Sequence, residues 1–224
     1  MKSTDIMIEV TSAVDIGEPA HIAATLHLPE EMPSGQLDLI FAVHGGGYNR
    51  HYWHPHFADD SYSFARFFTG HGKAVLAIDM LGMGQSSTPE PESRLDRMKI
   101  AAAHNAALAH CVAELARPVS VTGLGQSMGG LMIITQATAH EGLDRLAVLG
   151  WSNQPMVLAD IKRQYARDPS ILINLVGISY GANIVTSLAA QLNDAGIPVN
   201  YLGVLDGPML TPVTPNVHRV DNFV

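Results

Sequence analysis

Residues 118–130 read PVSVTGLGQSMGG, a stretch in which an apolar run leads directly into a glycine-rich turn. Its first six residues form a short apolar run typical of a buried strand, and a helical segment follows its last glycines. Between them, the G-x-S-x-G pattern centred on Ser127 predicts a sharp strand-to-helix turn, which needs small residues two before and two after the serine. Such a turn lifts the hydroxyl clear of the sheet, so we predict that Ser127 is a nucleophile. The alternative is a serine that only caps the helix.

The segments around this stretch alternate between strands and helices. Continuous apolar runs, typical of parallel strands covered by helices on both faces, occupy residues 37–43, 73–79 and 145–151. Helical segments separate them: one begins with a capping-box-like spacing at Ser93 and Asp96, and another covers 155–166. We therefore expect an α/β fold with a mostly parallel sheet and helices on both of its faces.

The N-terminal residues have a different periodicity. Residues 6–10 and 21–29 alternate between apolar and polar side chains, and Gly17 and Pro19 interrupt the connection between them. This pattern predicts an antiparallel hairpin ahead of the parallel sheet.

Composition limits the class of protein. The 224 residues are 47% hydrophobic and only 15% charged, which suits one globular domain over 1–224. A net charge of −8 with scattered Lys and Arg argues against nucleic-acid binding. The single cysteine, Cys111, cannot form a disulfide framework and is expected in the core. The chain shows no signal-peptide pattern and no 18-residue apolar run, so we expect a cytoplasmic protein without a membrane partner.

A second glycine-rich motif, His44-Gly45-Gly46-Gly47, follows directly after the apolar run at 37–43. Glycines at a strand end let backbone N–H groups approach a bound substrate, and one of them can form half of an oxyanion hole. A tight turn without a ligand is the alternative.

Together these motifs resemble the α/β-hydrolase family. HGGG at 44–47, IDMLGMGQS at 78–86 and GQSMGG at 125–130 carry the resemblance, which covers roughly residues 20–151 in the family's order. It implies that Ser127 is the nucleophile and that the N–H groups of Met128 and of Gly45 or Gly46 form the oxyanion hole. It also implies that Asp79 shapes a turn without a catalytic role, and that the protein needs neither a metal nor an organic cofactor.

The acid and the base of the catalytic triad are less clear in the sequence. Asp206 ends an apolar strand and is the best-placed acid, whereas Asp160 lies inside a helical segment. Of the two histidines after Ser127, His140 lies near the end of the following helix, which leaves His218 by elimination. Because His218 comes only 12 residues after Asp206, either the family's C-terminal part is compressed or the base is missing.

The G-x-S-x-G turn recurs as Gly177-Ile-Ser179-Tyr-Gly181. The chain then divides into a family-like front half over 1–151 and a partly duplicated turn unit over 152–224. Ser179 is either a second nucleophile or a helix cap.

Two other patterns suggest different chemistry. HYWHPHFADD at 51–60 resembles the H-x-H-x-D spacing of some zinc hydrolases, but Asp59 comes one residue late, and we favour a loop beside the active site with histidines that contact substrate. The glycines around Ser127 also fit a dinucleotide-binding turn, but the strand at 145–151 ends without the acidic residue that holds a ribose.

We therefore predict a serine hydrolase that cleaves small-molecule carboxylic esters through an acyl-enzyme, with Ser127, Asp206 and His218 as the triad. The alternatives are a non-catalytic or hybrid α/β-hydrolase-like protein and an NAD(P)-binding oxidoreductase. Whether the protein forms a homo-oligomer stays open.

Overall fold

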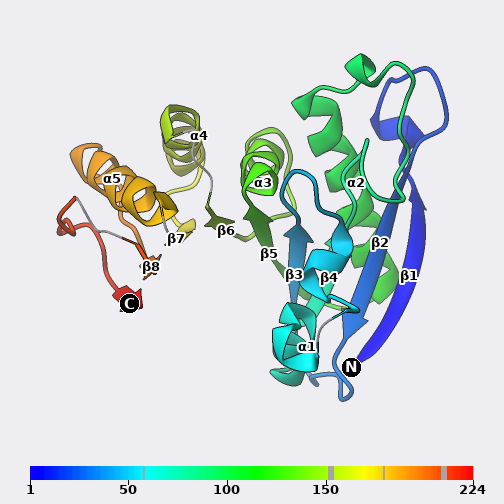
Figure 1. Ribbon diagram of the computed structural model, residues 1–224, viewed down its shortest axis with the longest axis horizontal. Coiled ribbons are helices and arrows are strands. Elements are labelled where there is room, and N and C mark those ends of the chain that lie inside the picture. The colour runs from blue at the N-terminus through cyan, green and yellow to red at the C-terminus, as the bar shows by residue number, and fades with distance from the viewer. Residues whose placement is uncertain (58, 151–153, 179, 208–210, 224) are drawn as a thin grey trace.

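The computed structural model describes residues 1–57, 59–150, 154–178, 180–207 and 211–223. Within them the strands form a single sheet in the order β1-β2-β4-β3-β5-β6-β7-β8-β9 (Figure 1). The strands are β1 (Lys2–Glu9), β2 (His21–Leu28), β3 (Leu37–Val43), β4 (Ala74–Ile78), β5 (Val119–Gln126), β6 (Arg145–Leu149), β7 (Leu172–Ile178), β8 (Tyr201–Leu205) and β9 (Val220–Phe223). β1 pairs with β2 and β2 with β4 in antiparallel fashion, and the strands from β4 to β9 pair in parallel. The predicted α/β class and N-terminal hairpin are confirmed.

Helices cover both faces of the sheet, as predicted. Four of them, α2 (Arg97–Leu115), α3 (Met128–Ala139), α4 (Gln154–Arg167) and α5 (Tyr180–Asp194), lie on one face, and α1 (Phe64–Gly70) lies on the other (Figure 1). Short 3-10 helices, η1 (Thr11–Ala13), η2 (Arg50–Trp53), η3 (Asp60–Tyr62) and η4 (Glu92–Arg94), occupy the connections. Within the described residues, no helix is both long enough and apolar enough to cross a membrane.

Strand β3 shows why its sequence is a continuous apolar run. Leu39, Phe41 and Val43 face the larger core under α2 to α5, whereas Ile40 and Ala42 face the smaller core around α1. Both sets are buried because successive strand residues point to opposite faces and each face is covered.

The start of α2 differs in detail from the prediction. Asp96 is itself the N-cap, and its carboxylate accepts hydrogen bonds of 2.8 Å from the N–H groups of Met98 and Lys99. Ser93 lies in η4, so the expected capping box over Ser93 and Asp96 is wrong. Cys111 is buried on the apolar side of α2, as expected.

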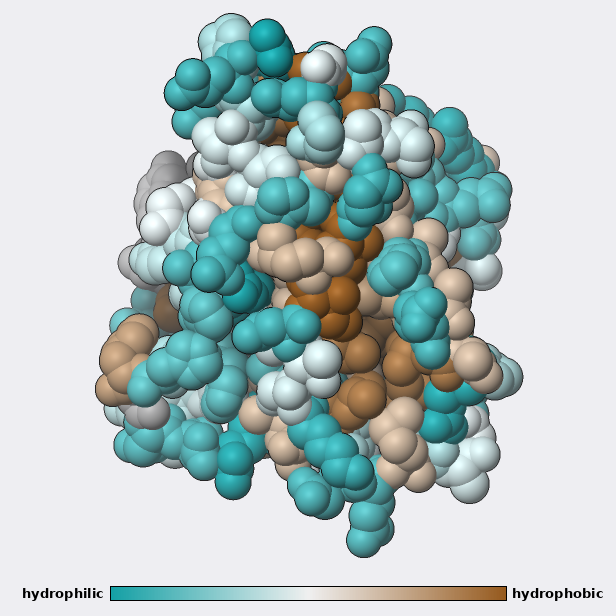
Figure 2. Space-filling view, turned by 90° about the vertical axis from the view of Figure 1, so that its right-hand side faces the viewer, coloured by the Kyte–Doolittle hydropathy of each residue, from teal (hydrophilic) through white to brown (hydrophobic). Residues whose placement is uncertain are grey.

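One edge of the sheet is β1, which lies at the right of Figure 1. Figure 2 shows this side of the molecule, where hydrophilic side chains surround a strip of apolar surface. The exposed Lys2, Asp5 and Glu9 place charges along β1. Charges on an edge strand oppose pairing with the edge of another sheet.

The strand order determines where a site can form. The chain runs from β3 to β4 on one side of β3 and then to β5 on its other side. The carboxyl ends of β3 and β5 therefore meet at a topological switch point, the usual position of ligand sites in open α/β sheets. Ser127 follows β5 there, and the glycine-rich loop at 44–47 follows β3.

Candidate active site

Ser127 occupies a strained turn between β5 and α3. Its backbone has φ 52° and ψ −119°, and its side chain makes no capping hydrogen bond to α3. A positive φ in a residue with a Cβ costs about 1–3 kcal/mol and persists only where the surroundings enforce it. Here the N–H of Ser127 donates to the carbonyl of Leu149 (2.7 Å), and the carbonyl of Ser127 accepts from Gly130 (2.9 Å). A helix cap therefore does not explain this serine.

The two flanking glycines are required by close backbone packing. A Cβ on Gly125 would overlap the carbonyl of Gly129, and a Cβ on Gly129 would overlap the carbonyl oxygens of Val43 and His44. The G-x-S-x-G pattern thus has the steric cause assumed for it from the sequence.

The glycine-rich loop lies directly against this turn. A Cβ built on Gly45 would lie 3.2 Å from the Cβ of Ser127, and one on Gly46 would lie 3.6 Å from the terminal methyl of Met128. Met128 is the first residue of α3, where N–H groups have no acceptor inside the helix. The structure therefore brings Ser127, the predicted nucleophile, together with the three residues predicted for the oxyanion hole.

Gln126 is a residue of this site that the sequence analysis did not single out. A Cβ on Gly45 would overlap its side-chain oxygen, so the amide of Gln126 lies against the glycine-rich loop. This oxygen is buried and has no hydrogen-bond partner within the described residues. Gln126 occupies the second position of the motif, which is a variable position, so no sequence signal distinguishes it.

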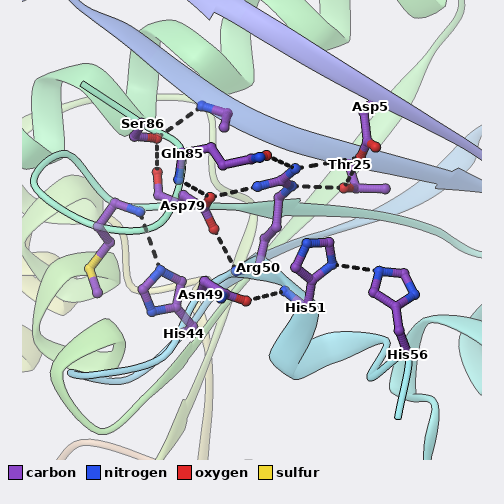
Figure 3. A network of polar contacts seen from close by, with 12 residues as sticks. Asp5, Thr25, His44, Asn49, Arg50, His51, His56, Asp79, Gln85 and Ser86 are labelled. Atoms are coloured by element: carbon purple, nitrogen blue, oxygen red, sulfur yellow. Dashed lines mark hydrogen bonds and ion pairs between the residues drawn. The ribbon is translucent and has the colours of Figure 1, made fainter. Parts of the chain in front are cut away.

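A buried ion pair, also missed in the sequence, holds the loop after β3 to the turn after β4 (Figure 3). Nη1 of Arg50 lies 2.6 Å from Oδ2 of Asp79, and the Arg50 N–H donates to Oδ1 of Asp79 (2.6 Å). The N–H of Gln85 donates to the same carboxylate (2.8 Å). A Cβ on Gly84 would overlap this carboxylate, which explains the glycine there. These contacts show that Asp79 holds the turn after β4 to the loop after β3.

His44 uses both ring nitrogens for backbone contacts. Its Nδ1 lies 2.8 Å from the carbonyl oxygen of Gly45, and its Nε2 accepts from the N–H of Met80 (3.3 Å). This arrangement requires a neutral ring with the proton on Nδ1, and burial lowers the pKa of His44. His44 thus shapes the loop and has no free lone pair for a proton from Ser127.

Asp206 follows β8 and Ser127 follows β5, so both lie at the carboxyl ends of the parallel strands. Its φ is 42°, and its N–H donates to the carbonyl of Phe223 (2.8 Å). β8 lies three strands from β5, which corresponds to about 14 Å at the usual strand spacing. Asp206 therefore lies at the carboxyl ends of the strands, as Ser127 does, but it does not lie beside Ser127.

His218 lies at the amino ends of the strands, whereas Ser127 lies at their carboxyl ends. Its N–H donates to the carbonyl of Val199 (2.9 Å), and Val199 precedes β8. Because β9 runs parallel to β8, the residues just before β9 lie at the amino ends of the strands. The structure thus does not bring the exposed His218 to Ser127 or to Asp206, and the triad predicted by elimination is not assembled.

The other two residues considered for the triad also lie elsewhere. His140 is the C-cap of α3, about 20 Å along the helix axis from Ser127. Asp160 is buried in α4 and pairs with Arg163 at 2.7 Å. Within the described part of the chain, the hydrogen bonds recorded for Ser127 are backbone bonds, and none involves an imidazole.

The second G-x-S-x-G turn shares one packing feature with the first. A Cβ on Gly177 would overlap the carbonyl of Gly181, as one on Gly125 would overlap that of Gly129. Ser179 lies outside the described residues, so the choice between nucleophile and cap stays a prediction.

The histidine-rich loop at 51–60 packs against the hairpin. His51, His54 and His56 line a pocket together with residues of β1 and β2, including His27. Asp59 caps η3 by accepting from the N–H of Ser61 (2.8 Å), so it is not part of this pocket. Within the described residues, no three His, Cys, Asp or Glu side chains already surround one point as metal ligands do.

Residues 38–170 match the family model for the alpha/beta hydrolase fold. The chain therefore belongs to the α/β-hydrolase family, which favours a hydrolase over the dinucleotide-binding alternative.

Solved structures are similar in fold at low sequence identity. A thermostable carboxyl esterase from Bacillus coagulans is 22% identical with a TM-score of 0.52, over 75% of this chain and 52% of the esterase. The alpha/beta hydrolase GrgF from Penicillium sp. sh18 is 14% identical with a TM-score of 0.52, over 96% of this chain and 83% of that protein. This chain thus spans about half the length of the esterase. The search of curated proteins found no match.

Proposed function

We propose that this protein is a serine hydrolase that cleaves carboxylic esters of small molecules through an acyl-enzyme intermediate. The observation that carries the proposal is the strained turn of Ser127, held against Gly45 and followed directly by Met128. This geometry suits attack by the hydroxyl on a carbonyl whose oxygen is bound by backbone N–H groups. The carboxyl esterase of similar fold is consistent with ester substrates.

In this mechanism the bond between Ser127 Oγ and the substrate carbonyl carbon forms while the serine proton passes to a base. The alcohol leaves with a proton, and water then hydrolyses the acyl-serine. N–H groups of Met128 and of the loop at 44–47 stabilise the oxyanion in both steps. Asp206 is the candidate acid, because it lies at the carboxyl ends of the strands as Ser127 does. Strands β5 and β8 are about 14 Å apart, so another group has to lie between Asp206 and Ser127.

A second candidate is a non-catalytic α/β-hydrolase-like protein. Two observations favour it. His218 lies at the amino ends of the strands, away from Ser127, and backbone contacts occupy both ring nitrogens of His44. Such a protein keeps the fold and the serine turn but lacks an activated nucleophile.

A fluorophosphonate probe distinguishes the two functions. The hydrolase proposal expects one-to-one labelling of the folded protein, loss of labelling in Ser127→Ala, and retained labelling in Ser61→Ala, a matched control at an exposed position. Ser179→Ala tests the second turn in the same assay. If the folded protein is not labelled, the non-catalytic function replaces the hydrolase.

A further inference from the structure

A polar cavity of about 140 Å³ lies between the β1–β2 hairpin and the loop that contains η2. Four imidazoles line it, from His27 of β2 and from His51, His54 and His56, and Asp5 of β1 adds a carboxylate. We call these five residues the histidine pocket. His27 comes from a strand 24 residues before His51, so only the fold brings the group together.

Two of the imidazoles are already spaced as metal ligands. Nε2 of His56 lies 2.9 Å from Nδ1 of His51, and the ring centroids are 4.5 Å apart (Figure 3). Two imidazole nitrogens bound side by side to one metal at about 2.0–2.1 Å lie about 2.9–3.4 Å from each other. The observed separation falls at the lower end of this range.

The other two imidazoles are oriented by serine hydroxyls. Nδ1 of His54 lies 2.6 Å from Oγ of Ser63, and Nδ1 of His27 lies 2.8 Å from Oγ of Ser3. A hydrogen bond at one ring nitrogen orients the ring and leaves the other nitrogen, Nε2, as the donor to a metal. The ring of His54 lies 5.7 Å from that of His56 and 5.5 Å from that of His27, centroid to centroid.

The described lining of the pocket carries one guanidinium, that of Arg50, and one carboxylate, that of Asp5. Its positive group, Arg50, lies 2.6 Å from the carboxylate of Asp79 and 3.8 Å from that of Asp5. Two carboxylates thus offset one guanidinium, and the described histidines of the pocket contact each other and serine hydroxyls rather than carboxylates.

We propose that the histidine pocket binds a divalent transition-metal ion of the Zn²⁺ or Ni²⁺ class, with His51 and His56 as the preformed pair and His54 as the third ligand. Imidazole is a preferred donor for this class of ion, whereas Mg²⁺ and Ca²⁺ require oxygen donors. As the side chains stand, no three donors of the described residues are grouped so that they could hold a metal ion, so metal binding requires the His54 side chain to move toward the pair from its present contact with Ser63. His27 is buried, and its ring meets that of His54 edge-on.

The test is isothermal titration calorimetry, in which ZnCl₂ or, separately, NiCl₂ is added to tag-free protein that was first treated with a chelator. It measures the number of ions bound per chain and their affinity. We expect one ion per chain and at least a tenfold loss of affinity in His56→Gln and in His51→Gln. His110→Gln, which changes an exposed histidine on α2, is the matched control and is expected to bind as the unchanged protein does. Circular dichroism of each variant verifies that it is folded.

A second measurement identifies the donors. The electron paramagnetic resonance spectrum of bound Cu²⁺ is expected to show at least two nitrogen ligands, and to lose one in His56→Gln. No binding by the folded protein, or equal weakening in His110→Gln and His56→Gln, would overturn the proposal. Either result would leave the labelling of Ser127 unaffected and so would not bear on the hydrolase function.

Discussion

At the scale of single residues, the site depends on a serine with an unusual backbone angle and on glycines at positions with no room for a Cβ atom. Ser127 adopts a positive φ without a capping bond, and Gly125 and Gly129 pack their Cα atoms against backbone carbonyl groups. A backbone carbonyl cannot move aside as a flexible side chain can. Substitution at these glycines therefore has to displace α3 or the loop after β3.

Gly125→Ala is expected to destabilise the protein by about 2 kcal/mol or more, because its Cβ would overlap the carbonyl of Gly129. Urea denaturation measures the change in the free energy of unfolding. Gly35→Ala is the matched control, since a Cβ there meets no atom within 4 Å, and its effect should stay within about 0.5 kcal/mol. Equal stabilities of the two variants would contradict the steric role of Gly125.

At the scale of elements, Arg50 connects three parts of the sheet. Besides its ion pair with Asp79, its Nε donates to Oγ1 of Thr25 on β2 (3.0 Å), and its Nη2 donates to Oε1 of Gln85 (2.6 Å). These bonds hold the connection that carries Gly45 and Gly46 against the turn after β4. The ion pair thus positions the glycine-rich loop at 44–47 without contacting Ser127.

Arg50→Met should destabilise the protein by about 3–5 kcal/mol, because it leaves the buried carboxylate of Asp79 without its cation. It should also slow fluorophosphonate labelling of Ser127 under conditions where the variant is folded. Arg66→Met removes an exposed pair with Asp60 and should cost less than about 1 kcal/mol, with labelling unchanged. If both variants lose similar stability, Arg50 does not have this positioning role.

At the scale of the whole molecule, buried imidazoles make stability depend on pH, and His104 and His27 join His44 in this respect. Burial lowers the pKa of His104 to about 3 and, together with repulsion from His54, that of His27 to about 4. The unfolded chain titrates these rings near pH 6.5. Below that pH the unfolded state binds more protons than the folded state does. The contribution of these residues to the free energy of unfolding is therefore fully present above about pH 6.5 and is lost as the pH drops toward 4.

His104→Leu should flatten this acid limb. Neither ring nitrogen of His104 has a hydrogen-bond partner within the described residues, so an apolar residue of similar size leaves no polar group unpaired. Chemical denaturation at pH 7.5 and pH 5 should show a smaller loss of stability on acidification for the variant. An unchanged pH dependence would assign the acid limb to other groups.

The local features of this protein follow from its sequence. Apolar runs and glycine positions specify strands and turns, because backbone sterics and periodic burial act over a few residues. The spacing of Ser93 and Asp96 indicates a helix near residue 97, but the structure shows that Asp96 rather than Ser93 is its N-cap. The turn of Ser127, the hairpin and the approach of Gly45 to Ser127 follow from such patterns and from the family's strand order.

Only the tertiary structure decided which distant side chains meet. The parallel direction of β9 leaves His218 at the amino ends of the strands, away from Ser127. The pairing of β2 with β4, and of β4 with β3, brings His27 to the loop after β3 that contains His51. Arg50 reaches Asp79 for the same reason, since sheet order brings β2, β3 and β4 together. Strand order and direction depend on the packing of the whole chain, and no spacing along the sequence encodes them.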